Sequence, residues 1–184
     1  MELSQKISLR INHKFLFSLC FALVMPVAAN CFFYLPFSPV PVTLQVFTVL
    51  LGAVMLGFPW AFYSQLIYIS MGLMGLGVFA GFRNTYLALA GPTAGYILGF
   101  LAASLVTGYL VDKKKTYPWL ILSLFLGLFC IYLLGYVHLL FYTFPAGLGS
   151  YQIFNTFKLG IAPFIIPDIV KLLLAANIFK ATKG

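Results

Sequence analysis

Long apolar runs follow one another along most of this chain, separated by short polar or irregular stretches. An α-helix needs roughly 20 predominantly apolar residues to cross a bilayer. On this criterion we predict six membrane-spanning helices, near residues 15–35, 43–57, 60–79, 87–111, 117–143 and 159–179. The sequence therefore predicts one all-α transmembrane domain over residues 1–184. In it a polar N-terminal segment (1–14) precedes a six-helix bundle (about 15–180).

The composition favours an integral membrane protein over a soluble domain. Of the 184 residues, 62% are hydrophobic and 8% are charged, whereas a soluble domain carries about 25% charged residues. A chain this apolar cannot cover its hydrophobic surface with polar side chains in water. We therefore expect a multi-pass protein of the cell (inner) membrane.

The positive charge indicates topology and not nucleic-acid binding. The formal net charge is +8, but the basic residues lie at the ends of apolar segments and form no basic face or RNA-binding motif. With both termini in the cytoplasm, the inner side would carry Lys6, Arg10, Lys14, Lys113, Lys114, Lys115, Lys180 and Lys183. The outer side would carry only Arg83 and Lys158. The bias towards cytoplasmic cations predicts cytoplasmic N- and C-termini.

A competing interpretation makes residues 1–29 a cleavable secretory signal. This stretch has a basic start, an apolar middle and a "VAA" string that resembles a cleavage site. Its removal would leave five spans and break the even topology that the charges favour. We therefore expect the first helix to be retained.

The irregular segments between the predicted helices gather on the outer side. These segments are "LPFSPVPVTLQ", "FAGFRNTYLALAGPTAGY" and "FYTFPAGLGSYQIFNTFKLG". The one obvious inner loop, "VDKKKTYP", is short and charged. This asymmetry predicts a binding site that faces outwards.

Asp168 and Lys171 stand inside the last apolar segment, "APFIIPDIVKLLLAA". Three residues apart on a helix, they share one face and can pair. A charge near the bilayer centre costs at least ~2.5–3.5 kcal/mol, so such residues are usually functional and face a cavity. The alternative is a neutralised pair that only locks two helices together. Pro163 and Pro167 favour a bent helix beside a cavity.

Five further residues are candidates for ligand binding on the outer side. Arg83 could hold a carboxylate in its guanidinium fork, or could be a loop arginine at the lipid headgroups. Asn84 can donate and accept at once. Thr43 and Gln45 would share a face in an extended approach to the second helix, although Thr43 could instead cap that helix. Tyr96 offers a ring and a hydroxyl to a site.

Three glycines in the fourth predicted helix favour close packing against another helix. Gly91, Gly95 and Gly99 lie four residues apart, so they form a stripe of small residues on one face.

The two histidines, His13 and His138, lack metal-ligand spacing. The sequence contains no phosphate-binding, serine-hydrolase or zinc-protease motif. It therefore predicts a binding protein that is not an enzyme and needs no metal or other cofactor.

Four strings together resemble the BioY family, the biotin-specific substrate-capture proteins (S components) of energy-coupling-factor (ECF) vitamin transporters. They are "PVPVTLQVFTVLLGAVMLG", "GLGVFAGF", "LAGPTAGYILGF" and "PFIIPDIVK". The resemblance covers roughly residues 15 to 180. It implies a six-helix membrane protein that binds biotin near its outer face and joins a transmembrane coupling protein and two ATPases. The family's P-x-D-x-x-K element, threonine–glutamine pair and tyrosine are matched by Pro167, Asp168, Lys171, Thr43, Gln45 and Tyr96.

The chemistry of biotin suggests a division of roles among these residues. Asp168 can accept from the urea N–H groups, and Gln45 or Asn84 can serve the urea carbonyl. We expect Arg83 to hold the valerate carboxylate, because Lys171 is expected to lie against Asp168. Other functions remain open: uptake of another small vitamin, a carrier without coupling subunits, a membrane enzyme acting on a lipid or isoprenoid, or a structural subunit.

Overall fold

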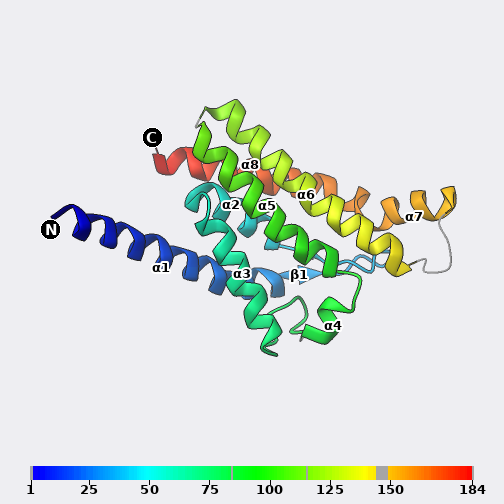
Figure 1. Ribbon diagram of the computed structural model, residues 1–184. Helices are drawn as coiled ribbons and strands as arrows, with labels where there is room; N and C mark the ends of the chain where they lie inside the picture. The colour runs from blue at the N-terminus through cyan, green and yellow to red at the C-terminus, as the bar shows by residue number, and fades with distance from the viewer. Residues whose placement is uncertain (1, 84, 115, 144–148, 184) are drawn as a thin grey trace.

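The computed structural model describes residues 2–83, 85–114, 116–143 and 149–183, and it shows an elongated helical bundle (Figure 1). The helices are α1 (Glu2–Asn30), α2 (Gln45–Leu56), α3 (Trp60–Leu73), α4 (Thr85–Leu89), α5 (Ala94–Lys113), α6 (Tyr117–Thr143), α7 (Ser150–Gly160), the 3-10 turn η1 (Ala162–Phe164) and α8 (Ile165–Lys183). Two short antiparallel strands, β1 (Phe32–Phe33) and β2 (Val42–Thr43), join α1 to α2.

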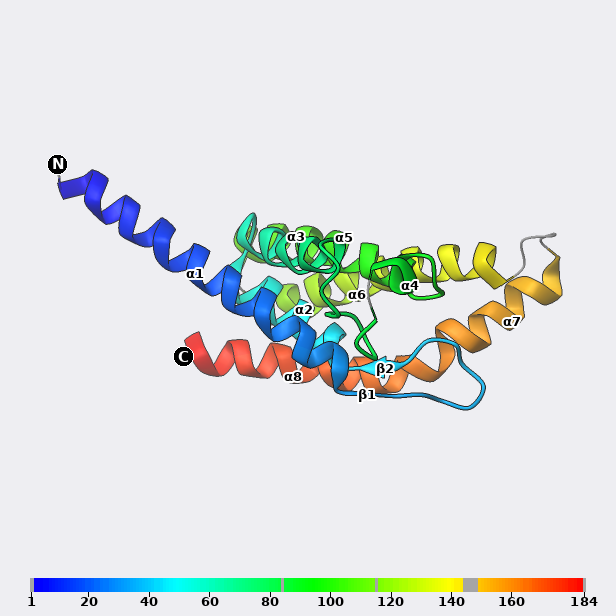
Figure 2. The same cartoon turned by 90° about the horizontal axis from the view of Figure 1, so that it is seen from below.

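The bundle has α2 near its centre, in contact with α1, α3, α5 and α8. Both chain termini lie at one end of the bundle, together with the α5–α6 turn (Figure 1). The α2–α3 turn reaches the same end, because the Phe58 backbone N–H donates to Asp112 Oδ2 at 2.8 Å. Strands β1 and β2, helix α4 and helix α7 lie towards the opposite end (Figure 2). The irregular backbone is therefore concentrated away from the termini.

Helices α5 and α6 pack closely because α5 presents glycines to α6. A Cβ added at Gly95 would collide with the Leu134 carbonyl oxygen and with His138, and one added at Gly99 would lie 2.7 Å from Ile131 Cα. The predicted packing role is confirmed for these two glycines. Gly91 lies before α5, and a Cβ added there would meet the Leu87 carbonyl oxygen instead of α6, so its predicted role in helix packing was wrong. Its carbonyl oxygen lies 3.0 Å from His138 Nε2 on α6.

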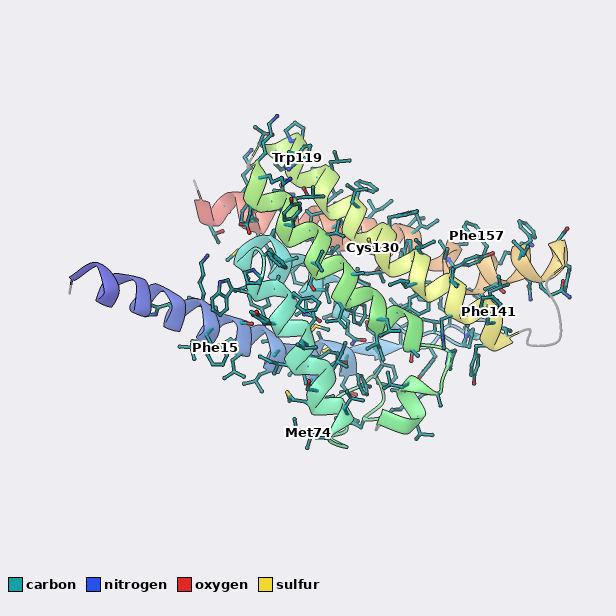
Figure 3. All side chains as sticks on the ribbon, viewed as in Figure 1. Phe15, Met74, Trp119, Cys130, Phe141 and Phe157 are labelled. Carbon is teal, nitrogen blue, oxygen red and sulfur yellow. The ribbon has the colours of Figure 1, made fainter. Side chains whose placement is uncertain are left out.

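The surface and the helix lengths are those of a multi-pass membrane protein. Among the described residues, four helical segments are long and apolar enough to cross a bilayer: His13–Asn30, Ala94–Lys113, Tyr117–Thr143 and Ser150–Thr182. Large apolar side chains such as Phe15, Met74 and Phe141 project outwards, with exposed fractions of 52%, 75% and 58% (Figure 3). Helix α2 has 12 residues and α3 has 14. Both are shorter than the roughly 20 residues that span a bilayer upright, so the count of six spans stays a prediction.

Several predicted helix boundaries were wrong. The first helix ends at Asn30 instead of residue 35, and the third ends at Leu73 instead of residue 79. The predicted helix 87–111 is two helices, α4 and α5, separated by residues 90–93. Pro92 explains this break, because it lacks an N–H and disfavours helical geometry at the residue before it.

The last predicted span also differs from the structure. Part of the third outer segment, expected to be irregular, forms helix α7 from residue 150 to residue 160. The chain then turns through η1, which contains Pro163, before α8 begins at Ile165. The predicted bend therefore lies at η1. Pro167 falls in the first turn of α8, where a missing N–H costs little, so it does not bend that helix.

Candidate functional site

A cavity opens between the N-terminal parts of α2, α5 and α8 and the middle of α6, and it is bordered by β2, α4 and the segment before α4. About 690 Å³ of space between its walls is not filled by atoms, its open mouth included. Apolar and aromatic side chains form most of its wall: Val40, Pro41, Val46, Phe79, Ala80, Ala88, Ile97, Phe100, Ile131 and Phe164. Its polar lining consists of Tyr34, Thr43, Gln45, Arg83, Thr93, Tyr96, Tyr132, Asp168 and Lys171. Such a cavity suits a small, largely apolar ligand with a few polar groups.

Asp168 and Lys171 form an ion pair on the wall that α8 contributes. Lys171 Nζ lies 2.6 Å from Asp168 Oδ1, and the Tyr132 hydroxyl on α6 donates to Asp168 Oδ2 at 2.8 Å. Asp168 is only 2% exposed and Lys171 only 9%. An ionised carboxylate has about four acceptor positions, and these two contacts use one on each oxygen. The Asp168 carboxylate can therefore accept further donors from a ligand in the cavity.

Thr43 and Gln45 line the cavity from the β2–α2 junction. Gln45 Nε2 donates to the Tyr68 hydroxyl at 2.9 Å, and the Tyr68 hydroxyl donates to the Val78 carbonyl at 3.3 Å. The Gln45 backbone N–H donates to Thr43 Oγ1 at 3.1 Å. Leu44 occupies the N-cap position of α2, but Thr43 Oγ1 accepts from the first backbone N–H of that helix. Thr43 therefore lines the cavity and also satisfies a free N–H at the helix start. These bonds fix the Gln45 amide at the cavity, with one of its N–H groups available.

Tyr96 lines the cavity with its aromatic ring, whereas its hydroxyl is bonded to the protein backbone. The hydroxyl donates to the Gly160 carbonyl at 2.8 Å and so ties α5 to the end of α7. The ring lies directly against Gly135, where an added Cβ would overlap it. Tyr96 is therefore a fixed aromatic wall of the cavity.

Arg83 lies at the mouth, on a tight turn before α4. Residues Phe79 and Arg83 pair as an isolated antiparallel bridge, and the turn between them has positive φ at Gly81 (73°) and Phe82 (53°). The Phe82 backbone N–H donates to Asn30 Oδ1 at 2.9 Å, which attaches the turn to the end of α1. Arg83 Nη2 donates to the Tyr34 hydroxyl at 3.0 Å. The guanidinium thus bridges the two segments that border the mouth. Asn84 lies outside the described residues.

The geometry brings six of the seven sequence-predicted site residues to one cavity. No metal site is found in the described part of the chain (residues 2–83, 85–114, 116–143 and 149–183). It contains no group of three or more His, Cys, Asp or Glu side chains that could hold a metal ion. The cavity therefore offers hydrogen bonds, one buried ion pair and apolar contacts.

Comparison with known proteins identifies the family. The profile of the BioY family matches residues 4–184. This chain belongs to the BioY family. The protein named "Biotin transporter BioY" of Thermotoga maritima is 38% identical over 152 residues, which cover 83% of this chain and 86% of that one. The "Probable biotin transporter BioY" of Pyrococcus horikoshii is 41% identical over 148 residues, which cover 80% and 83% of the two chains.

A solved structure shares the fold of this BioY chain. It is described as the crystal structure of the S-component for biotin from an ECF-type ABC transporter. The TM-score is 0.81 over 100% of this chain and 94% of that chain, at 19% sequence identity. The predicted family and the S-component-like fold are thus confirmed. The named relatives are transporters, in line with the prediction that the chain is not an enzyme.

Several polar residues of this BioY site escaped the sequence analysis: Tyr34, Thr93 and Tyr132 line the cavity, and Tyr68 holds Gln45. Tyr132 contacts Asp168, and Tyr68 contacts Gln45. Both stand in apolar helices with no charged neighbour or turn beside them, so nothing local distinguishes them from the other tyrosines. A buried carboxylate such as that of Asp168 needs hydrogen-bond donors, so a tyrosine hydroxyl could have been expected beside it. The sequence does not indicate which tyrosine.

Proposed function

We propose that this chain captures biotin in the cavity and serves as the S component of a biotin uptake system. The observation that carries the proposal is the buried Asp168 carboxylate, held by Lys171 and Tyr132 on the wall of a largely apolar cavity. Membership of the BioY family supports the same ligand. The ligand undergoes no chemical change, because the role of the site is recognition and release.

The urea ring of biotin has two N–H donors and one carbonyl, and the cavity offers complementary groups. Asp168 accepts from the N–H groups with its remaining lone pairs. The Gln45 amide, fixed through its bond to Tyr68, donates its second N–H to the urea carbonyl. Asn84 is a second proposed partner for that carbonyl. The apolar rings of the ligand then lie against walls such as Tyr96 and Phe100.

The valerate carboxylate is assigned to Arg83 at the mouth. Lys171 is already paired with Asp168 at 2.6 Å, whereas Arg83 is bonded to a neutral tyrosine hydroxyl. Among the described lining residues, the charged side chains are Asp168, Lys171 and Arg83. Their sum is a single positive charge, which complements a monoanionic ligand.

For transport, we propose six membrane crossings with both termini in the cytoplasm and the cavity mouth towards the outside of the cell membrane. The location of both termini at one end of the bundle (Figure 1) and the cationic sequence around them support this orientation. The proposed partners are a transmembrane coupling protein and two ATPases of the ECF type. Their ATP hydrolysis would drive reorientation of the loaded chain.

Ligand-dependent thermal unfolding of the detergent-purified chain tests this proposal. Biotin at about a thousand times its dissociation constant should add ~4 kcal/mol to the free energy of unfolding. Riboflavin, a vitamin without a cyclic urea fused to a thioether ring, should add nothing. Stabilisation by riboflavin and not by biotin would indicate an S component for another vitamin. Stabilisation by neither would contradict ligand capture by this cavity.

Arg83→Gln is expected to weaken binding of biotin by about ten- to a hundred-fold. The basis is the loss of a hydrogen bond to a charged group, worth about 1.5–3 kcal/mol. Binding of biotin amide, which lacks the carboxylate, should change little. Titration calorimetry with both ligands measures the difference. Lys158→Gln removes another outer-side cation outside the cavity and is the matched control. If Lys171→Met abolished the discrimination and Arg83→Gln did not, the carboxylate would belong to Lys171.

Tyr132→Phe is expected to weaken biotin binding about tenfold, because Asp168 loses the hydrogen bond that positions its carboxylate. A hydrogen bond to a charged group is worth about 1.5–3 kcal/mol, and a tenfold loss corresponds to the lower end of that range. Tyr136→Phe, one helical turn further along α6, is the control, since the Tyr136 hydroxyl donates to the Ile153 carbonyl. A double-mutant cycle separates positioning from a general loss of packing. In an Asp168→Asn background, Tyr132→Phe should cost nothing further. An equal loss in both backgrounds would refute the role given to Tyr132.

A further inference from the structure

Three lysines at the end of the bundle that carries the termini each lie over an aromatic ring. Lys113 Nζ is 4.3 Å from the centre of the Tyr109 ring, and Lys180 Nζ is 5.2 Å from that of Tyr117. Lys114 Nζ is 6.0 Å from the centre of the Trp119 ring. All three lysines are exposed. Cation–π contact with exposed rings holds an ammonium weakly and leaves its N–H donors directed to the surroundings.

Two of these rings, Trp119 and Tyr117, are held in place by helix-to-helix hydrogen bonds, and the Tyr109 ring packs edge-on against Phe58. The Trp119 indole N–H donates to the Leu110 carbonyl at 2.8 Å and joins α6 to α5. The Tyr117 hydroxyl donates to Asn177 Oδ1 at 3.3 Å and joins α6 to α8. Tryptophan and tyrosine prefer the headgroup level of a bilayer. We therefore expect the three ammonium groups, which lie around the start of α6, to stand at headgroup depth.

This positive charge is not neutralised within the described part of the chain. The nearby acidic residue, Asp112, directs its carboxylate to the Phe58 backbone N–H at 2.8 Å. Among the described residues, the ion pair within 4.0 Å is the distant one between Lys171 and Asp168. Below the lysines, α6 and α8 expose apolar side chains to the surroundings: Leu122, Leu126, Leu174 and Ile178. Cationic donors above an apolar helix surface match the headgroup and chains of an anionic phospholipid.

We propose that this end of the bundle binds anionic phospholipid headgroups through Lys113, Lys114 and Lys180. The inference is independent of biotin capture, since none of these residues lines the cavity. It also goes beyond topology: if the lysines served only to orient the chain during insertion, the lipid composition around the mature protein would make no difference.

Lipid retention tests the inference. The full chain is reconstituted into nanodiscs that contain phosphatidylcholine and phosphatidylglycerol, released into detergent, and its bound lipids are counted by native mass spectrometry. We expect phosphatidylglycerol to be enriched over its share of the nanodisc, and the enrichment to fall in high salt. Equal retention of the two lipids would overturn the proposal. Glycerol phosphate added in excess should not displace the lipid. Displacement would show a phosphate site without a role for the acyl chains, and would also overturn the proposal.

Matched variants locate the effect. Changing Lys113, Lys114 and Lys180 to Gln should lower the enrichment at least about fivefold, which corresponds to one lysine contact at a lipid surface. Changing the same three lysines to Arg should preserve it. Changing Lys6, Arg10 and Lys14 to Gln removes the same charge from the N-terminal part of α1 and should leave most of the enrichment. Equal losses in the two Gln variants would mean a general charge attraction and refute this site. If the Gln variant does not fold, the selectivity of the native chain for phosphatidylglycerol and its loss in high salt still test the proposal.

Discussion

Asp168→Asn is expected to weaken biotin binding by roughly two to three orders of magnitude. The substitution removes the charged acceptor and leaves the buried Lys171 ammonium without its partner at 2.6 Å. Each hydrogen bond from the urea to a charged acceptor is worth about 1.5–3 kcal/mol, so the loss of two accounts for the expected drop in affinity. Breaking the buried pair also lowers the stability of the fold, by about 3–5 kcal/mol. The new amide also directs N–H groups where the urea N–H groups of biotin need an acceptor. Titration calorimetry of the detergent-purified variant measures the loss.

Asp112→Asn is the matched control for this experiment. It removes the same charge from the opposite end of the bundle, where Asp112 accepts from the Phe58 N–H. Its biotin affinity should equal that of the native chain. The thermal midpoint of each variant without ligand must also be compared, because an unfolded Asp168→Asn chain would not bind for a different reason. A folded Asp168→Asn chain with native affinity would contradict the role given to the carboxylate and leave the ion pair as a link within the bundle.

Gly95→Ala is expected to lower the free energy of unfolding by about 2–3 kcal/mol, the cost of overpacking a tight contact. The added methyl would collide with the Leu134 carbonyl oxygen and would reach Gly135 Cα at 3.1 Å. These are backbone atoms of α6, so the two helices must separate. Equilibrium unfolding in mixed micelles with increasing dodecyl sulfate measures the change.

Gly52→Ala provides the comparison, because it adds the same methyl to a glycine within α2. There the nearest atom is the Phe21 side chain at 3.0 Å, which can rotate away. Alanine also favours the helix over glycine by about 1 kcal/mol. We therefore expect a change within about 1 kcal/mol of the native value. If the two variants lost equal stability, the α5–α6 contact would not be the tight one that the structure shows.

The fold could be predicted from the sequence wherever hydropathy is continuous. Helix α6 begins and ends at residues 117 and 143, as expected, because its apolar run has a charged turn before it. The fourth span was predicted as one helix because residues 87–111 are mostly apolar and contain no charged residue. The break at Pro92 depends on backbone geometry, to which a hydropathy criterion is blind. Helix α7 was missed for the opposite reason, since its polar and aromatic residues give no apolar run.

The candidate site was predictable where a residue is chemically out of place. Asp168 and Lys171 are conspicuous as charges in an apolar segment, and their spacing already indicates pairing. Tyr132 is unremarkable in sequence, and its contact with Asp168 exists only because α6 packs against α8. The shapes of the side chains decide which faces of two apolar helices pack together. The hydropathy pattern contains no information about these shapes.

The most direct test of biotin capture is an experimental structure of this chain with biotin bound. We expect the urea nitrogens within about 3 Å of the Asp168 carboxylate, the rings beside Tyr96, and the valerate carboxylate at Arg83. Biotin bound outside the cavity, or with its carboxylate against Lys171 and its urea ring at the mouth, would contradict the proposed recognition.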